Sequence, residues 1–223
     1  MSSAPDQGVR SPLWHLMRLG LLASGRGSNV RSILEAIREE RLDAVAALLI
    51  CDRRGAAVVD VASERGVPVE LVERSAFGSR AAQQAAIGEL LDRYGVDLVA
   101  LAGFAPILDD VVVERFAGRI LNIHPSLLPA FAGAMAPEPQ AAALRAGVKL
   151  SGCTIHFVTA DVDAGPIVAQ ASVPVLPDDN VESLSQRILA QEHRLYPTVL
   201  QWFAEGRVHI DAGRVRIEGR STP

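Results

Sequence analysis

Cysteine and aromatic residues are scarce in this chain of 223 residues. The only two cysteines, Cys51 and Cys153, are most simply reduced thiols, because a chain of this length can bury a core without a disulfide framework. No Cys-x-x-Cys pair or Cys/His cluster has the spacing of metal ligands, so we expect no metal site. Aromatic residues make up 4%, too few for a platform on which single-stranded nucleic acid would stack.

Long apolar runs and an excess of basic charge are also missing. No stretch reaches the length of a transmembrane helix, and the N-terminal residues lack the apolar core of a signal peptide. The formal net charge of −4 argues against a sequence-independent nucleic-acid binder. We therefore expect a cytoplasmic protein without a membrane or nucleic-acid partner. A flexible N-terminal extension is expected over residues 1–16 and a single domain over residues 17–223.

Apolar segments alternate with segments of helical periodicity in the first half of the chain. Strands are predicted at residues 16–24, 44–52, 67–72, 96–104 and 119–124. Helices are predicted at residues 28–42, 56–66 and 79–95, the first with Ser28 as its N-cap. Apolar strands separated by helices predict a parallel sheet covered on both faces. The predicted fold class is therefore α/β, with a doubly wound, mostly parallel sheet.

The second half of the chain has a different pattern. Residues 148–159 and 166–176 are predicted to form two strands joined by a tight turn, as an antiparallel C-terminal addition to the sheet. The longest helix is predicted over residues 180–206, with a kink or break at Pro197 because proline lacks a backbone N–H. Residues 207–219 are predicted to close the chain as a small hairpin.

A glycine-rich turn joins the first predicted strand to the first predicted helix. Backbone N–H groups at such a helix start bind anions through their donors and the helix dipole. Val30 stands where a dinucleotide fingerprint has its third glycine, and no Gly-Lys-Ser/Thr follows. The turn therefore suits one phosphate better than a dinucleotide, and an ordinary capped turn is the alternative interpretation. Its residues are Gly25, Arg26, Gly27, Ser28 and Asn29.

Asn122 and His124 lie two positions apart at the end of the fifth predicted strand, so their side chains share one face. Open parallel sheets bind ligands outside the carboxyl ends of their strands, and the glycine-rich turn lies at the same edge. An amide beside an imidazole can bind an oxyanion or a carbonyl, and histidine can exchange a proton near neutral pH. The alternative is that both side chains only cap backbone; the neighbouring phosphate turn favours a functional pair.

Asp161 and Asp163 lie in the turn between the two strands of the second half. Aspartates in such turns are ordinary turn formers, so a structural role is the simplest interpretation. A carboxylate near His124 would raise its pKa and hold its ring in one orientation. Sequence distance alone leaves open whether Asp163 and His124 meet.

Five segments, in this order, resemble the phosphoribosylglycinamide formyltransferase family. They are LLASGRGSN, VALAGF, LNIHPSLLP, SGCTIHFVTADVDAGPIVAQ and QEH, within residues 19–208. The resemblance implies a Rossmann-like formyltransferase fold whose N-terminal half binds a ribonucleotide phosphate and whose C-terminal half binds folate. It implies an enzyme of purine biosynthesis that transfers a formyl group from 10-formyltetrahydrofolate to glycinamide ribonucleotide. It also implies no metal, and a monomer or homodimer.

The same resemblance implies roles for individual residues. The catalytic residues would be Asn122, His124 and Asp163, with Asp163 keeping His124 charged at neutral pH. The substrate's phosphate would be held by Gly25, Arg26, Gly27, Ser28 and Asn29, and its ribose hydroxyls by Glu192. The folate would be bound by Arg80, Ala105, Pro106, Ile107, Leu108, Ala160, Asp161, Val162 and Ala164.

Some residues depart from the family pattern. Met135 and Pro137 stand where many members carry histidine or another polar residue, and Pro106 replaces an arginine of some bacterial relatives. The segment 133–147 is also longer than usual, so we expect an altered loop at the rim of the folate site.

Three other functions share parts of this pattern. Formyltetrahydrofolate hydrolase has an additional N-terminal regulatory domain, and methionyl-tRNA formyltransferase has a further C-terminal domain and a basic surface. The short segment before the first strand, the end at Pro223 and the net charge argue against both. A non-catalytic, phosphate-binding regulatory domain is a further alternative, which the presence of all three catalytic side chains disfavours.

Overall fold

Seven strands form one sheet within residues 16–219, the part of the chain that the computed structural model describes. The N-terminal extension predicted over residues 1–16 lies, except for Leu16, outside these residues. In sheet order the strands are β3 (Val69–Leu71), β2 (Ala44–Cys51), β1 (Met17–Leu22), β4 (Leu98–Leu101), β5 (Ile120–His124), β6 (Leu150–Phe157) and β7 (Ile167–Pro174).

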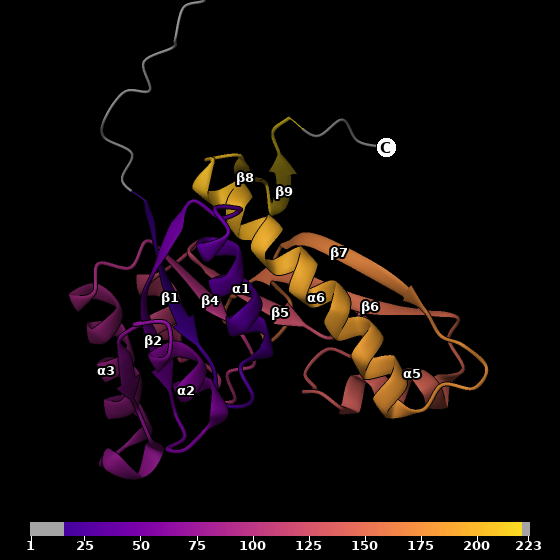
Figure 1. The fold of residues 1–223 in the computed structure, drawn as a ribbon, viewed down its shortest axis with the longest axis horizontal. Helices are drawn as coiled ribbons and strands as arrows, with labels where there is room; N and C mark the ends of the chain where they lie inside the picture. The colour runs from indigo at the N-terminus through magenta and orange to yellow at the C-terminus, as the bar shows by residue number, and fades with distance from the viewer. Residues whose placement is uncertain (1–15, 220–223) are drawn as a thin grey trace, which may run out of the picture.

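The pairing directions confirm the predicted fold class. β1 to β5 are parallel to one another, whereas β6 pairs antiparallel with β5 and β7 antiparallel with β6. A separate two-stranded hairpin, β8 (Val208–Asp211) and β9 (Arg214–Ile217), follows near the C-terminal end, as predicted. In Figure 1 the parallel strands lie at the left together with α1, α2 and α3, and the β6–β7 pair extends to the right.

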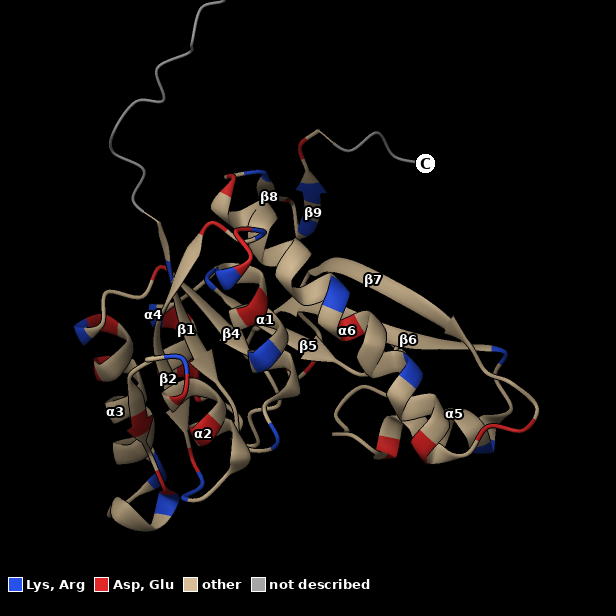
Figure 2. Cartoon of the chain, viewed as in Figure 1, with Lys and Arg blue, Asp and Glu red and all other residues tan. Residues whose placement is uncertain are grey.

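The helices cover both faces of the sheet. They are α1 (Ser28–Arg38), α2 (Ala57–Ser63), α3 (Arg80–Arg93), α4 (Asp110–Arg115), α5 (Glu138–Ala146) and α6 (Val181–Ala204), with a short 3-10 turn at Arg74–Ala76. Among the described residues, no helix combines the length and the apolar character needed to cross a membrane. Lys and Arg are interspersed with Asp and Glu along α1 and α6 (Figure 2).

Two hydrophobic layers hold this arrangement together. One layer joins the sheet to α1, α2 and α6, with Ile33, Val58 and Leu200 fully buried in it. The other joins the opposite face to α3 and α4, where Ile87 and Phe116 are almost completely buried. Because both faces are covered, the central strands are apolar throughout their length rather than alternating, as expected of a parallel sheet.

The order of the strands locates the ligand-binding edge. The chain passes from β1 to β2 and β3 on one side, and then crosses to β4 and β5 on the other. Ligands of open α/β sheets bind outside the carboxyl ends of the strands where this reversal occurs, here between β1 and β4. The glycine-rich turn after β1 and the end of β5 both lie at this edge.

The predicted N-cap of α1 is wrong. Ser28 is the first helical residue, and Gly27 precedes it with a left-handed backbone (φ 74°) and no side-chain cap. A Cβ at Gly27 would also come within 2.9 Å of the Cα of Val58. Position 27 therefore requires glycine for two reasons: its left-handed backbone angle and the close approach of α2.

Of the predicted kink or break at Pro197, the break is wrong, because α6 runs through this residue from Val181 to Ala204. A proline inside a helix costs about 3 kcal/mol, since one backbone hydrogen bond is lost. The neighbouring Tyr196, Val199 and Leu200 are fully buried against the sheet. Each such side chain contributes about 1.5–3 kcal/mol on burial, so packing of this segment outweighs the local penalty.

Two helices were not predicted from the sequence. α4 is only 6 residues long, and α5 lies in the segment 133–147 that was expected to be an altered loop. Leu184 and Ile188 of α6 form, with Ala143 of α5 and two strand residues, a small third cluster. α5 therefore packs against α6, and this contact stabilises a helix within segment 133–147.

Candidate active site

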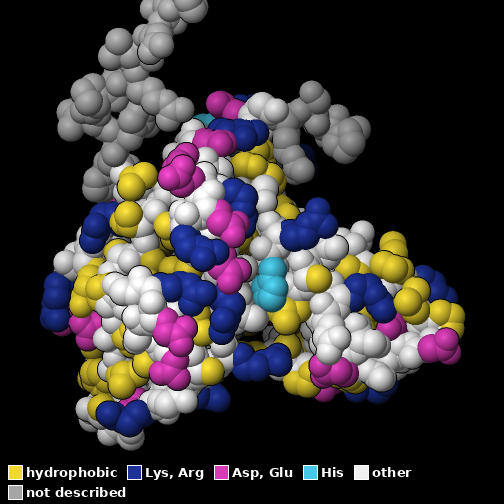
Figure 3. Space-filling view, viewed as in Figure 1, with side chains coloured by type: hydrophobic (Ala, Val, Ile, Leu, Met, Phe, Trp, Pro, Cys, Tyr) yellow, Lys and Arg dark blue, Asp and Glu magenta, His cyan; other side chains and the backbone are white. Residues whose placement is uncertain are grey.

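A cavity of about 500 Å³ opens at the carboxyl ends of β1, β4 and β5. Its lining comes from segments that are far apart in the sequence: residues 25–29, 101–108, 122–125, 133–136, 156, 158, 159, 161–163, 189 and 192. Figure 3 shows a hollow in the middle of this face, with Lys and Arg side chains beside it. The cavity thus joins the glycine-rich turn, the end of β5 and the turn between β6 and β7.

The glycine-rich turn lines one end of this cavity with all five of its predicted residues. The Val58 backbone N–H donates to the Gly25 carbonyl at 3.0 Å, which ties the turn to α2. The Ala105 N–H donates to the hydroxyl of Ser24 at 2.7 Å, which ties it to the segment after β4. Arg26 is exposed, so a cationic side chain stands beside a helix N-terminus, the combination that favours a bound anion.

Glu192 of α6 meets this turn. The Asn29 side-chain amide donates to its carboxylate at 2.7 Å, and both side chains are buried at the cavity wall. Burial raises the pKa of Glu192, and the hydrogen bond from Asn29 opposes that rise only in part. The side-chain oxygen of Asn29 is buried without a partner. The Glu192 carboxylate therefore offers an acceptor at the cavity wall to which a bound molecule could donate hydroxyl groups.

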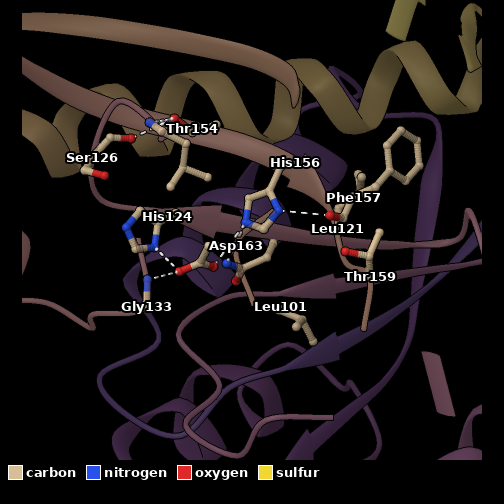
Figure 4. Close-up of polar contacts among 12 residues, drawn as sticks. Leu101, Leu121, His124, Ser126, Gly133, Thr154, His156, Phe157, Thr159 and Asp163 are labelled. Carbon is tan, nitrogen blue, oxygen red and sulfur yellow. Dashed lines mark hydrogen bonds and ion pairs between the residues drawn. The ribbon is translucent and has the colours of Figure 1, made fainter. Parts of the chain in front are cut away.

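Asn122, His124 and Asp163 all line the cavity. Nδ1 of His124 is 3.2 Å from a carboxylate oxygen of Asp163, although 39 positions separate the two residues in the sequence. Asp163 adopts a left-handed backbone (φ 54°), and its carboxylate accepts from the Gly133 N–H at 2.8 Å. The turn between β6 and β7 therefore aims this side chain at β5, and Figure 4 shows the carboxylate between His124 and His156.

The second nitrogen of His124 also faces an acceptor. Nε2 is 3.1 Å from the carbonyl oxygen of Phe131, so the ring can donate from both nitrogens only as the imidazolium. The loop that carries Phe131 is anchored below the site, because Thr154 donates to the Ser126 carbonyl and accepts from the Leu128 N–H. His124 is therefore held on both sides and cannot rotate freely.

Burial lowers the pKa of His124 below its ordinary value, although Asp163 and the Phe131 carbonyl act to raise it. The expectation that Asp163 keeps His124 charged at neutral pH stays a prediction: the carboxylate raises the pKa of His124, but desolvation is the larger effect. Burial acts to raise the pKa of Asp163, but its contacts with His156 and Gly133 and the charge of His124 lower it overall. His124 thus lies beside a carboxylate whose lowered pKa favours its ionised form, so a proton taken up by the imidazole would be stabilised there.

His156 is a site residue that the sequence analysis missed. It pairs with Asn122 across β5 and β6, is 2% exposed, and lines the cavity. Its Nε2 is 3.1 Å from the Asn122 side-chain nitrogen and 3.5 Å from an Asp163 oxygen. Thr154 and His156 are polar residues two positions apart in a mostly apolar strand, the same signal that singled out the pair on β5.

The residues implied for folate divide into two groups. The first lines the cavity, and it consists of Ala105, Pro106, Ile107, Leu108, Asp161 and Val162. The second lies outside the lining, and it consists of Arg80, Ala160 and Ala164. Arg80 is at the rim, where its guanidinium donates to the Ile107 carbonyl at 3.0 Å and pairs with Asp109 at 2.5 Å. Met135 of the altered segment lines the same end of the cavity and is 54% exposed.

The two cysteines take no part in this cavity. Cys51 and Cys153 are both free and buried. Burial raises the pKa of the Cys153 thiol to about 12, so it has no nucleophilic character at neutral pH. Within residues 16–219, no three His, Cys, Asp or Glu side chains are grouped as ligands of a metal would be. The polar groups that meet at the end of β5 are therefore an amide, two imidazoles and a carboxylate.

Comparison with known proteins agrees with this geometry. Residues 17–200 match the family described as formyl transferase. The chain is 36% identical to phosphoribosylglycinamide formyltransferase of Haemophilus influenzae, over 93% of this chain and 97% of that protein. It is 48% identical to glycinamide ribonucleotide transformylase 1 of Symbiobacterium toebii, whose crystal structure superposes with a TM-score of 0.89 over 95% of this chain and 99% of that one.

A third relative is much longer. The chain is 41% identical to the bovine trifunctional purine biosynthetic protein adenosine-3, over 89% of this chain but only 19% of that protein. The chain thus corresponds to about a fifth of the trifunctional relatives' length. Fold, cavity and sequence agree, and the chain belongs to the formyl transferase family.

Proposed function

We propose that the protein transfers the formyl group of 10-formyltetrahydrofolate to the amine of glycinamide ribonucleotide. The products are formylglycinamide ribonucleotide and tetrahydrofolate, a step of de novo purine biosynthesis. One observation carries the proposal: the cavity joins an anion-binding turn to an amide, an imidazole and a carboxylate that can stabilise a tetrahedral oxyanion. The relatives' names point to the same reaction.

The ribonucleotide fits the end of the cavity formed by residues 25–29 and Glu192. Its phosphate would accept from the backbone N–H groups at the start of α1, with Arg26 as the neighbouring cation. Its ribose hydroxyls would donate to the carboxylate of Glu192, which Asn29 holds at the cavity wall. The amine of the substrate would then reach toward β5, where Asn122 and His124 lie.

The folate fits the opposite end of the cavity. Residues 105–108 and Val162 line this end with backbone atoms and apolar side chains. The exposed side chains of Ile107 and Met135 add to its apolar surface. Apolar walls with a few polar groups are typical of sites that bind a flat heterocycle. Arg80 would contact the cosubstrate only at its outer end, because it lies outside the lining and is paired with Asp109.

The chemistry at the centre is attack of the amine on the formyl carbon. A new C–N bond forms, the carbonyl electrons move onto oxygen, and a tetrahedral oxyanion results. Asn122 donates an N–H to that oxygen, and His124 stabilises the charge as the imidazolium when it takes up a proton beside Asp163. Collapse breaks the bond to the folate nitrogen, which takes a proton as it leaves, while the amine loses one.

The assay of choice follows the absorbance of the folate product with and without glycinamide ribonucleotide. We expect product only when both compounds are present, in equal amounts of tetrahydrofolate and formylated ribonucleotide. Folate product that forms equally well without the amine would identify a hydrolase instead. No product under either condition, with the ribonucleotide still bound in a calorimetric titration, would identify a phosphate-binding regulatory domain.

A further inference from the structure

His156 has both of its ring nitrogens engaged, and the two contacts together define its protonation. The residue lies on β6 opposite Asn122 and is buried, with 2% of its surface exposed. Nδ1 is 2.9 Å from the carbonyl oxygen of Phe157. A carbonyl oxygen only accepts, so Nδ1 carries the hydrogen.

The other nitrogen, Nε2, is 3.1 Å from the side-chain nitrogen of Asn122. An amide nitrogen only donates, so Nε2 must present its lone pair. Asp163 is farther away, at 3.5 Å, and a carboxylate would require a hydrogen on the same atom. The shorter contact therefore favours the tautomer that carries its hydrogen on Nδ1 and directs the lone pair of Nε2 at the Asn122 amide.

We propose that His156 is a positioning residue that orients the amide of Asn122. This inference rests on the proposed function, because it concerns the donor to the oxyanion. One N–H of Asn122 is held by His156, and since Asn122 lines the cavity, the second N–H is left for the bound formyl oxygen. Without His156 the amide could turn by 180° and present its oxygen, which would repel the oxyanion.

The same arrangement separates the two histidines. His124 faces Asp163 at 3.2 Å and the Phe131 carbonyl, so it gains two acceptors when it is charged. His156 would lose the hydrogen bond from Asn122 if it were charged. Asp163 is therefore a nearer acceptor for a proton on His124, at 3.2 Å, than for one on His156, at 3.5 Å.

Nitrogen NMR of the full-length protein, labelled with ¹⁵N-histidine, tests this assignment without substrate. The ring-nitrogen signals of His156 are identified as those that are absent from the spectrum of His156→Gln. We expect them to show a protonated Nδ1 and an unprotonated Nε2 at neutral pH. A protonated Nε2 on this ring would overturn the proposal, because Asn122 would then face it with its oxygen. Since no catalysis is measured, this result is independent of the proposed reaction.

Kinetics of three variants provide the second test. In His156→Leu we expect kcat to fall by about 10-fold to 100-fold, less than the roughly 10²–10³ expected for removal of the donor itself, with the KM of both substrates unchanged. His156→Gln should recover part of this loss, because its side-chain oxygen can accept from Asn122. His209→Gln, on the exposed β8–β9 hairpin, is the matched control and should keep full activity.

Two outcomes of these kinetics would overturn the proposal. One is a normal kcat in His156→Leu, and the other is a loss that appears in KM rather than in kcat. If His156→Leu does not fold, as judged by circular dichroism, the comparison of His156→Gln with the native protein decides. A kcat of His156→Gln below that of Asn122→Ala would then show that His156 does more than orient the amide. If the native protein forms no product, the proposed function fails while the NMR result still stands.

Discussion

Replacing Asn122 by alanine removes the proposed donor to the oxyanion. In the structure one N–H of this amide is bound to His156 at 3.1 Å, and one remains for the substrate. Loss of a single such donor lowers kcat by about 10²–10³, which corresponds to roughly 2.7–4 kcal/mol of transition-state stabilisation. The KM of both substrates should stay within about threefold, because the donor acts on charge that develops only in the transition state.

The measurement is the initial rate of folate product formation over a range of both substrate concentrations. Gln83→Ala is the control, because Gln83 is a buried side-chain amide that donates to the Val72 carbonyl at 2.6 Å and does not line the cavity. Both variants should lose about 1–3 kcal/mol of stability in urea unfolding. A fall in kcat below about tenfold for Asn122→Ala, or an equal fall in the control, would refute the reasoning.

Three further predictions concern the charge at the site, the substrate end and the core. In Asp163→Asn the pKa of His124 should fall further, because the carboxylate that raises this pKa is removed. The limb of the pH profile of kcat/KM that reports His124 should therefore move to lower pH. A limb that does not move would contradict this coupling. In Glu192→Gln the KM for glycinamide ribonucleotide should rise more than kcat falls, as steady-state kinetics would show. Tyr196→Phe should destabilise the protein by about 1–3 kcal/mol in urea unfolding, because its hydroxyl donates to carbonyls of both β4 and β5, whereas Tyr94→Phe should have a smaller effect.

Much of the fold follows from local sequence patterns. The apolar runs that became β1, β2, β4 and β5, and the periodic segments that became α1 and α3, were placed within a few residues of their observed limits. These elements are long or strongly patterned, and burial on both faces leaves little choice of residue. The exceptions were decided by packing between distant elements: Pro197 is held in α6 by its buried neighbours, and Gly27 is required by the approach of Val58.

In the candidate site, too, some features follow from local sequence patterns and others from packing between distant segments. Local sequence patterns were enough to predict which side chains could do chemistry: strand periodicity puts Asn122 and His124 on one face, and the glycine-rich turn predicts an anion site at that edge. How these side chains meet depends on the packing of distant segments. The 3.2 Å contact between Asp163 and His124, the pairing of His156 with Asn122, and the low pKa of a buried His124 depend on the antiparallel strand β6 and the turn beyond it. Distances and desolvation are properties of the packed molecule, because they are set by residues that lie far apart along the chain.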